Sequence, residues 1–164
     1  MSITLRIRNE STRKRLYRRD ALLRRAERIC EEERVTEHVE LSVLFCDDPF
    51  IQSLNKEYRS VNRPTDVLSF EQPSFESAQS RTLGDIVVSL ETVEHNCMGD
   101  RKRMRQEVYL LFCHGLLHLL GYDHATIRER KIMQAKQAHY LGLNPRDAWS
   151  FGPKRHRTRQ SVRA

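Results

Sequence analysis

The chain has 164 residues and a mass of 19.4 kDa, a size that corresponds to one domain with its own hydrophobic core. Hydrophobic residues make up 38% of the sequence and charged residues 31%, and this balance excludes a disordered chain. The formal net charge of +7 favours a polyanionic partner, either a nucleic acid or an anionic membrane surface.

The first expected element is a strand over residues 3–8, in which Ile3, Leu5 and Ile7 alternate with polar residues. This pattern lacks the continuous apolar region of a signal peptide, and no run of about 18 apolar residues occurs in the chain. We therefore expect a cytoplasmic protein that does not span a membrane.

Apolar runs and helical periodicity continue through the first half of the chain. They predict a helix over 16–31, a strand over 40–46, a helix over 48–58, a strand over 67–70, an exposed loop over 71–82 and a strand over 86–89. Four cysteines occur, none in a C-x-x-C pair, and we interpret them as small buried hydrophobic residues: Cys30, Cys46, Cys97 and Cys113.

The second half is helical, with predicted helices over 90–98, 106–120 and 126–141. The helix over 106–120 is apolar on most sides, which indicates burial. Because strands come early and helices late, the sequence predicts an α+β fold: a small mixed β-sheet of about four strands packed with about five helices, with the histidine-bearing helix against the sheet. Residues 1–152 are expected to form one domain, and 153–164 a basic, disordered tail.

The most informative segment is His114-Gly-Leu-Leu-His118-Leu-Leu-Gly121-Tyr-Asp-His124. His114 and His118 are four residues apart, so both imidazoles extend from one helix face and can reach one metal ion. Gly121 permits a tight turn that can return His124 to the same ion. Three neutral nitrogen ligands with an open fourth position are typical of a catalytic zinc site, although imidazole also suits nickel, copper and iron. The alternative is three histidines unrelated to any metal.

The same spacing occurs in the metzincin proteases, which carry a glutamate general base directly after the first histidine. Here that position is Gly115, so ordinary metalloprotease chemistry is disfavoured. A peptidase would need its base from elsewhere in the chain.

Three segments in register resemble the YbeY family of bacterial endoribonucleases, also described as rRNA maturation factors. They are residues 114–124 (HGLLHLLGYDH), 58–70 (YRSVNRPTDVLSF) and 84–89 (GDIVVS), and the resemblance spans about residues 3–142. It implies a metal-dependent, single-strand-specific endoribonuclease that acts in 16S rRNA 3′-end maturation and ribosome quality control.

The resemblance also implies that His114, His118 and His124 hold one Zn²⁺, that His114 and Arg59 are catalytic, and that 16S rRNA in ribosomal particles is the partner. A guanidinium can hold a phosphate with two hydrogen bonds, although Arg59 read alone also fits a structural arginine. The alternative function is a non-catalytic ribosome assembly factor with a structural zinc. Asp85 and Asp123 are candidates either to orient a ligand histidine or to shape the backbone locally.

The positive charge is uneven along the chain. Residues 13–28 hold eight basic and two acidic side chains, and residues 154–164 hold five basic and no acidic ones. A third basic run, over 101–105, is expected just before the histidine-bearing helix. Beside a histidine metal site, these runs favour RNA as the polyanion.

Overall fold

The computed structural model describes residues 1–13, 15–73 and 80–149. In chain order, its elements are β1 (Ser2–Asn9), α1 (Arg19–Glu32), β2 (His38–Cys46), α2 (Asp48–Arg59), β3 (Val67–Glu71), β4 (Ser80–Ser89), α3 (Leu90–Asn96), α4 (Arg101–Leu119) and α5 (Ile127–Leu141). The strands lie in the order β1-β2-β4-β3. β1, β2 and β4 are parallel, whereas β3 is antiparallel to β4. The predicted α+β fold with a mixed four-stranded sheet is confirmed.

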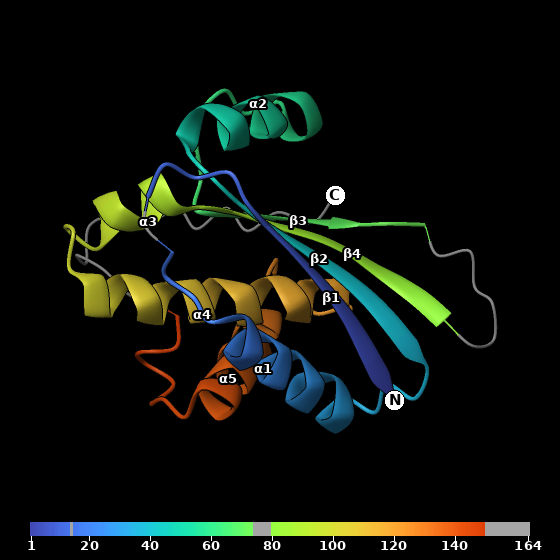
Figure 1. Ribbon diagram of the computed structural model, residues 1–164. Helices are drawn as coiled ribbons and strands as arrows, with labels where there is room; N and C mark the ends of the chain where they lie inside the picture. The colour runs from blue at the N-terminus through green and yellow to red at the C-terminus, as the bar shows by residue number, and fades with distance from the viewer. Residues whose placement is uncertain (14, 74–79, 150–164) are drawn as a thin grey trace.

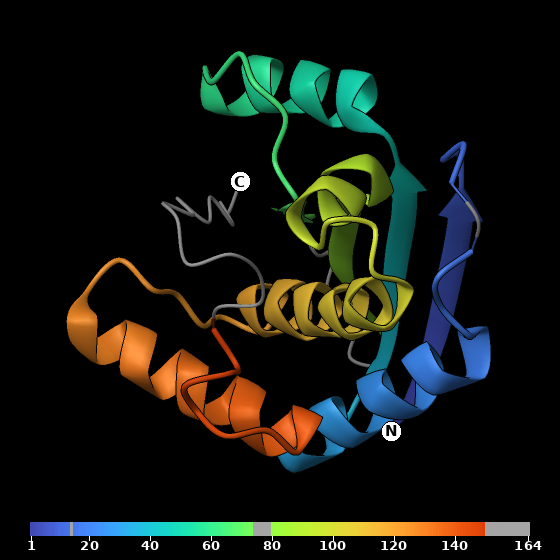
Figure 2. The ribbon, with the colours of Figure 1, turned by 90° about the vertical axis from the view of Figure 1, so that its left-hand side faces the viewer.

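Helices lie on both faces of the sheet. α4 lies along one face together with α1 and α5, and α2 lies on the opposite face (Figures 1 and 2). Every residue of α4 from Leu110 to Leu119 is buried, which confirms that the histidine-bearing helix packs against the sheet. None of the described helices is both long enough and apolar enough to cross a membrane.

Among the helices, α4 and α1 begin furthest from their predicted starts. α4 begins five residues before the predicted start, because the side chain of Asp100 accepts a hydrogen bond from the Arg103 backbone N–H and caps the helix. The basic run 101–105 therefore forms the first turns of α4 rather than preceding it. α1 begins at Arg19, and Leu16 is buried without being helical.

The predicted exposed loop over 71–82 is wrong at both ends. Glu71 belongs to β3, and residues 80–82 are already paired with β2. Gly84 does not open the strand but lies inside β4, where the pairing with β2 shifts between Glu40 and Leu41. A side chain there would meet the Phe70 carbonyl oxygen, because a Cβ would lie 2.0 Å from it, and φ is +136°. Residues 74–79 lie outside the described chain.

The two ends of α5 and the burial of the cysteines agree with the sequence predictions. α5 begins with a capping box in which Thr126 and Glu129 exchange hydrogen bonds, and it is followed by Gly142 in the left-handed conformation. The four cysteines are all buried, as expected. The basic tail predicted over 153–164 lies outside the described residues.

Candidate metal centre

The turn after α4 brings the third histidine back to the first two. The Tyr122 N–H donates to the Leu117 carbonyl and the Gly121 N–H donates to the His118 carbonyl, each at 3.0 Å. These two bonds form a Schellman motif with Gly121 at the left-handed position, where φ is +109°. The chain reverses within this motif, as the sequence predicted from Gly121.

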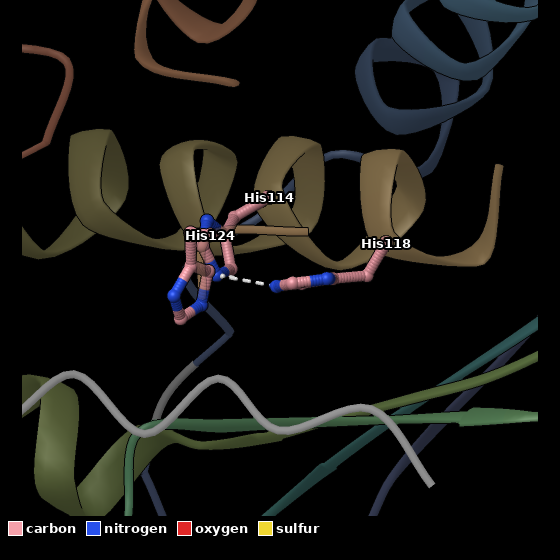
Figure 3. Close-up of side chains that lie close together, drawn as sticks. All are labelled: His114, His118 and His124. Carbon is pink, nitrogen blue, oxygen red and sulfur yellow. Dashed lines mark hydrogen bonds between the residues drawn. The ribbon is translucent and has the colours of Figure 1, made fainter. Parts of the chain in front are cut away.

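The three histidines converge on one point. One ring nitrogen from each of His114, His118 and His124 lies within 4.8 Å of the others. The Nε2 atoms of His114 and His118 are 3.1 Å apart, and Figure 3 shows the two imidazoles directed toward each other with His124 beside them. His114 and His118 are buried, and His124 is half-buried.

The hydrogen bonds of two of the rings identify the nitrogen that carries the proton in the neutral imidazole. His114 Nδ1–H donates to Gln137 Oε1 at 2.6 Å, and His118 Nδ1–H donates to the Tyr122 carbonyl at 2.8 Å. The Gln137 orientation follows from its amide Nε2, which donates to the Ala148 carbonyl. In its neutral form, each of these two imidazoles therefore presents an Nε2 lone pair to the shared point.

This arrangement fits a cation. With both rings neutral, their two Nε2 lone pairs face each other at 3.1 Å and repel unless a proton or a metal ion lies between them. Nitrogen ligands of a tetrahedral zinc ion, each about 2.0–2.1 Å from the metal, would be separated by roughly 3.3 Å. His124 Nε2 is buried and has no hydrogen-bond partner among the described residues. The donor set thus matches a three-histidine metal site.

Two residues around the histidines were not identified from the sequence. Gln137, fully buried on α5, holds His114 through its amide oxygen. Trp149 places its ring centroid 5.3 Å from that of His114 and 5.4 Å from that of His124. No local sequence pattern links either residue to the histidines.

Arg59, the last residue of α2, is connected to α4 through β3. Its Nη2 donates to the Ser69 carbonyl at 3.2 Å, and Ser69 Oγ donates to the Gly115 carbonyl at 3.4 Å. Partial burial lowers the pKa of Arg59, but a guanidinium remains charged at neutral pH. A permanent positive charge is therefore held against the backbone of β3 at Ser69, whose side chain contacts α4 at Gly115, the residue after His114.

Gly115 explains in steric terms why no carboxylate follows His114. A Cβ at this position would lie 2.9 Å from Cγ2 of Ile86 and 3.1 Å from Ser69 Oγ. Since real Cβ contacts are longer, the close packing of α4 on β3 and β4 leaves no room for a glutamate. The sequence argument against metalloprotease chemistry therefore has a structural basis.

The remaining sequence candidates lie outside the histidine group. Asp85 is part of β4 and accepts a hydrogen bond from Gln72 Nε2, whereas Asp123 accepts from the His124 backbone N–H. Neither of these hydrogen bonds involves a ligand ring, and both agree with a structural role for the carboxylate. Cys113 is buried, and burial raises the pKa of its thiol to about 12, which agrees with a packing role.

Comparisons with known proteins agree with this geometry. Residues 6–143 match the family model described as endoribonuclease YbeY. The chain is 41% identical over 125 residues to an endoribonuclease YbeY of Pelotomaculum thermopropionicum, with 74% of this chain and 82% of that protein covered. It is 43% identical to that of Thermoanaerobacter sp. strain X514, over 69% and 79% of the two chains. The solution structure of TM1509 from Thermotoga maritima matches with a TM-score of 0.58 and 30% identity, over 89% of each chain.

Proposed function

The chain belongs to the endoribonuclease YbeY family, and from this premise we propose that it is a zinc-dependent, single-strand-specific endoribonuclease of the cytoplasm that matures the 3′ end of 16S rRNA. Its partners are then RNA and ribosomal particles. The observation that carries the proposal is the convergence of three ring nitrogens: the Nε2 atoms of His114 and His118 are 3.1 Å apart and lie beside the buried Nε2 of His124, so the three rings offer a ligand set for one ion.

The residues of the chain have distinct proposed roles. His114, His118 and His124 would hold the zinc, which when bound lowers the pKa of a water ligand and polarises a phosphoryl oxygen. Gln137 and the Tyr122 carbonyl keep two of the ligands in the metal-binding tautomer. The indole of Trp149, against His114 and His124, shields the ligand rings from bulk water.

Arg59 is proposed to bind the scissile phosphate. Its guanidinium is oriented by the Ser69 carbonyl and by the Phe70 ring, whose centroid lies 5.6 Å from Cζ. A fixed cation of this kind orients a phosphodiester with two hydrogen bonds and stabilises the negative charge that develops during cleavage. Lysine is a poor substitute, because an ammonium group cannot form the same planar pair of bonds.

The test is cleavage of a single-stranded RNA by purified, metal-analysed protein. We expect His114→Ala to lose both bound metal and cleavage. Arg59→Ala should keep the metal and lose about 10²–10³-fold in cleavage at saturating RNA, with Arg59→Lys recovering only part of the loss. Arg63→Ala is the matched control, since this exposed arginine lies four residues further along the same segment.

The outcomes separate the catalytic proposal from its alternatives. Equal cleavage by wild type, Arg59→Ala and His114→Ala would overturn the catalytic assignment. Absence of cleavage together with retained binding to ribosomal particles would favour an assembly factor with a structural zinc. A double-stranded RNA of the same sequence should resist cleavage if the single-strand specificity is correct.

A further inference from the structure

Glu33 lies where three parts of the chain meet, although it is remote in sequence from every histidine of the site. It is the C-cap residue of α1, and its side chain is 10% exposed. Its Oε1 accepts hydrogen bonds from Lys136 Nζ at 2.6 Å and from the Tyr140 hydroxyl at 2.5 Å. Its Oε2 accepts from the Tyr122 hydroxyl at 2.5 Å. We call these four residues the Glu33 network.

The local sequence does not favour a carboxylate at this position. The end of a helix carries partial negative charge, so an acidic residue there is unfavourable by a few tenths of a kcal/mol to about 1 kcal/mol. Partial burial of Glu33 adds to this cost and would raise its pKa, yet the bonds from Lys136, Tyr122 and Tyr140 lower that pKa below its usual value. Tertiary contacts with α5 and with the α4–α5 turn therefore keep Glu33 ionised.

Tyr122 connects Glu33 to the histidines. Its hydroxyl is held by Glu33 on α1, and its ring lies 5.0 Å from Lys136 Nζ. Its backbone carbonyl accepts the Nδ1–H of His118, and His124 follows two residues later. One residue thus links the end of α1 to the orientation of one ligand and to the path of the turn that carries another.

We propose that Glu33 is a positioning residue for the three-histidine site, acting through Tyr122 to hold His118 and His124 in their ligating arrangement. The inference rests on the proposed metal binding and adds to it a residue from a separate element. Partners that orient ligands typically change metal affinity by 10–100-fold. Because Glu33 acts one residue further away, we expect about tenfold.

Two variants that each lose one hydroxyl oxygen separate the effect on metal affinity from a general loss of stability. Tyr122→Phe and Tyr140→Phe each remove one hydroxyl that donates to Glu33, but only Tyr122 belongs to the histidine turn. Trp149, the one tryptophan of the chain, lies beside two histidines and provides a fluorescence signal for Co²⁺ binding. Zn²⁺ affinity follows from competition against Co²⁺, and urea unfolding of the metal-free proteins measures the structural cost of each change.

We expect Tyr122→Phe to weaken Co²⁺ and Zn²⁺ binding about tenfold and Tyr140→Phe to leave both within threefold of wild type, at comparable losses of stability. Glu33→Gln should weaken metal binding, whereas Glu32→Gln, which removes the neighbouring contact with His139 on α5, should not. Wild-type affinity in Tyr122→Phe, or equal losses in both tyrosine variants, would overturn the inference while leaving the proposed function intact. Absence of metal binding by the wild type would overturn the proposed function itself.

Discussion

Two of the ligand imidazoles, His114 and His118, are fixed by an acceptor on Nδ1, and for His114 that acceptor is a side chain. Gln137 is fully buried, its Oε1 lies 2.6 Å from His114 Nδ1, and its amide N–H donates to the Ala148 carbonyl. A neutral acceptor at this point keeps the imidazole in one tautomer without placing a second charge in the core.

Replacing Gln137 therefore tests the tautomer argument. Gln137→Leu keeps the approximate volume but removes the acceptor, and we expect zinc affinity to fall by 10–100-fold in a chelator competition assay. Gln137→Glu keeps an acceptor for His114 and should retain more affinity than the leucine variant. If both variants bind zinc equally well, the hydrogen bond does not select the tautomer.

Gly115 is required by the approach of α4 to the sheet, not by its backbone conformation. Alanine ordinarily stabilises a helix relative to glycine by about 0.5–1 kcal/mol. Here the added Cβ would lie 2.9 Å from Ile86, and overpacking costs about 1–3 kcal/mol. We expect Gly115→Ala to lower the free energy of unfolding by about 1–2 kcal/mol in urea denaturation. In an Ile86→Ala background only the 3.1 Å approach to Ser69 Oγ remains, so the same change should destabilise less, and an equal loss there would contradict the steric explanation.

At the level of elements, local sequence signals determined most of the fold and the core of the site. The spacing of His114, His118, Gly121 and His124 encodes both the helix face and the turn, so the ligand set was predictable from one segment. The start of β4 was not predictable in this way. Gly84 resembles a residue that opens a strand, whereas the need for glycine there comes from the register shift against β2 and the close approach of β3. Only tertiary contacts connect Gln137, Trp149 and Glu33 to the histidines, and no sequence pattern contains these contacts.

The junction between β1 and α2 is held by one carboxylate that precedes a helix without capping it. Asp47 Oδ1 accepts from the Ser11 hydroxyl at 2.6 Å, and Oδ2 accepts from the Thr12 N–H and hydroxyl at 2.8 and 2.7 Å. Arg13 Nη1 lies 3.3 Å from Asp47 Oδ2. Partial burial alone would raise the pKa of Asp47, but these hydrogen bonds and the arginine lower it below the usual value.

The lowered pKa of Asp47 predicts that the protein loses stability as the pH falls. A carboxylate with a depressed folded-state pKa contributes stability that is fully present above its unfolded pKa of about 3.9 and is lost as pH falls through the folded value. We expect Asp47→Asn to be about 1–3 kcal/mol less stable than wild type at pH 7. Urea unfolding at pH 7, 5 and 3 should show this difference intact at pH 5 and reduced at pH 3. A difference that stays constant down to pH 3 would show that charge on Asp47 contributes nothing.

For the whole molecule, the structure changes how the net charge of +7 should be interpreted. Part of the positive charge of segment 13–28 is paired within the fold, since Arg13 contacts Asp47 and Glu91, Arg24 contacts Asp20, and Arg28 contacts Glu32. These pairs leave less free positive charge in this segment than its sequence suggests. The basic side chains of residues 154–164, which have no acidic residues among them, therefore become the stronger candidates for phosphate contacts.

Deleting residues 154–164 tests this division between affinity and chemistry. The segment carries five basic side chains, and each phosphate contact on a single strand contributes roughly 0.7 to the slope of log affinity against log salt. We expect the truncated protein to bind single-stranded RNA more weakly at low salt, with a slope shallower by at most about 3.5. Cleavage at saturating RNA should be unchanged, because the histidines and Arg59 are all retained. A fall in cleavage at saturation would place the segment within the catalytic machinery, and an unchanged salt slope would show that its charges do not contact the RNA.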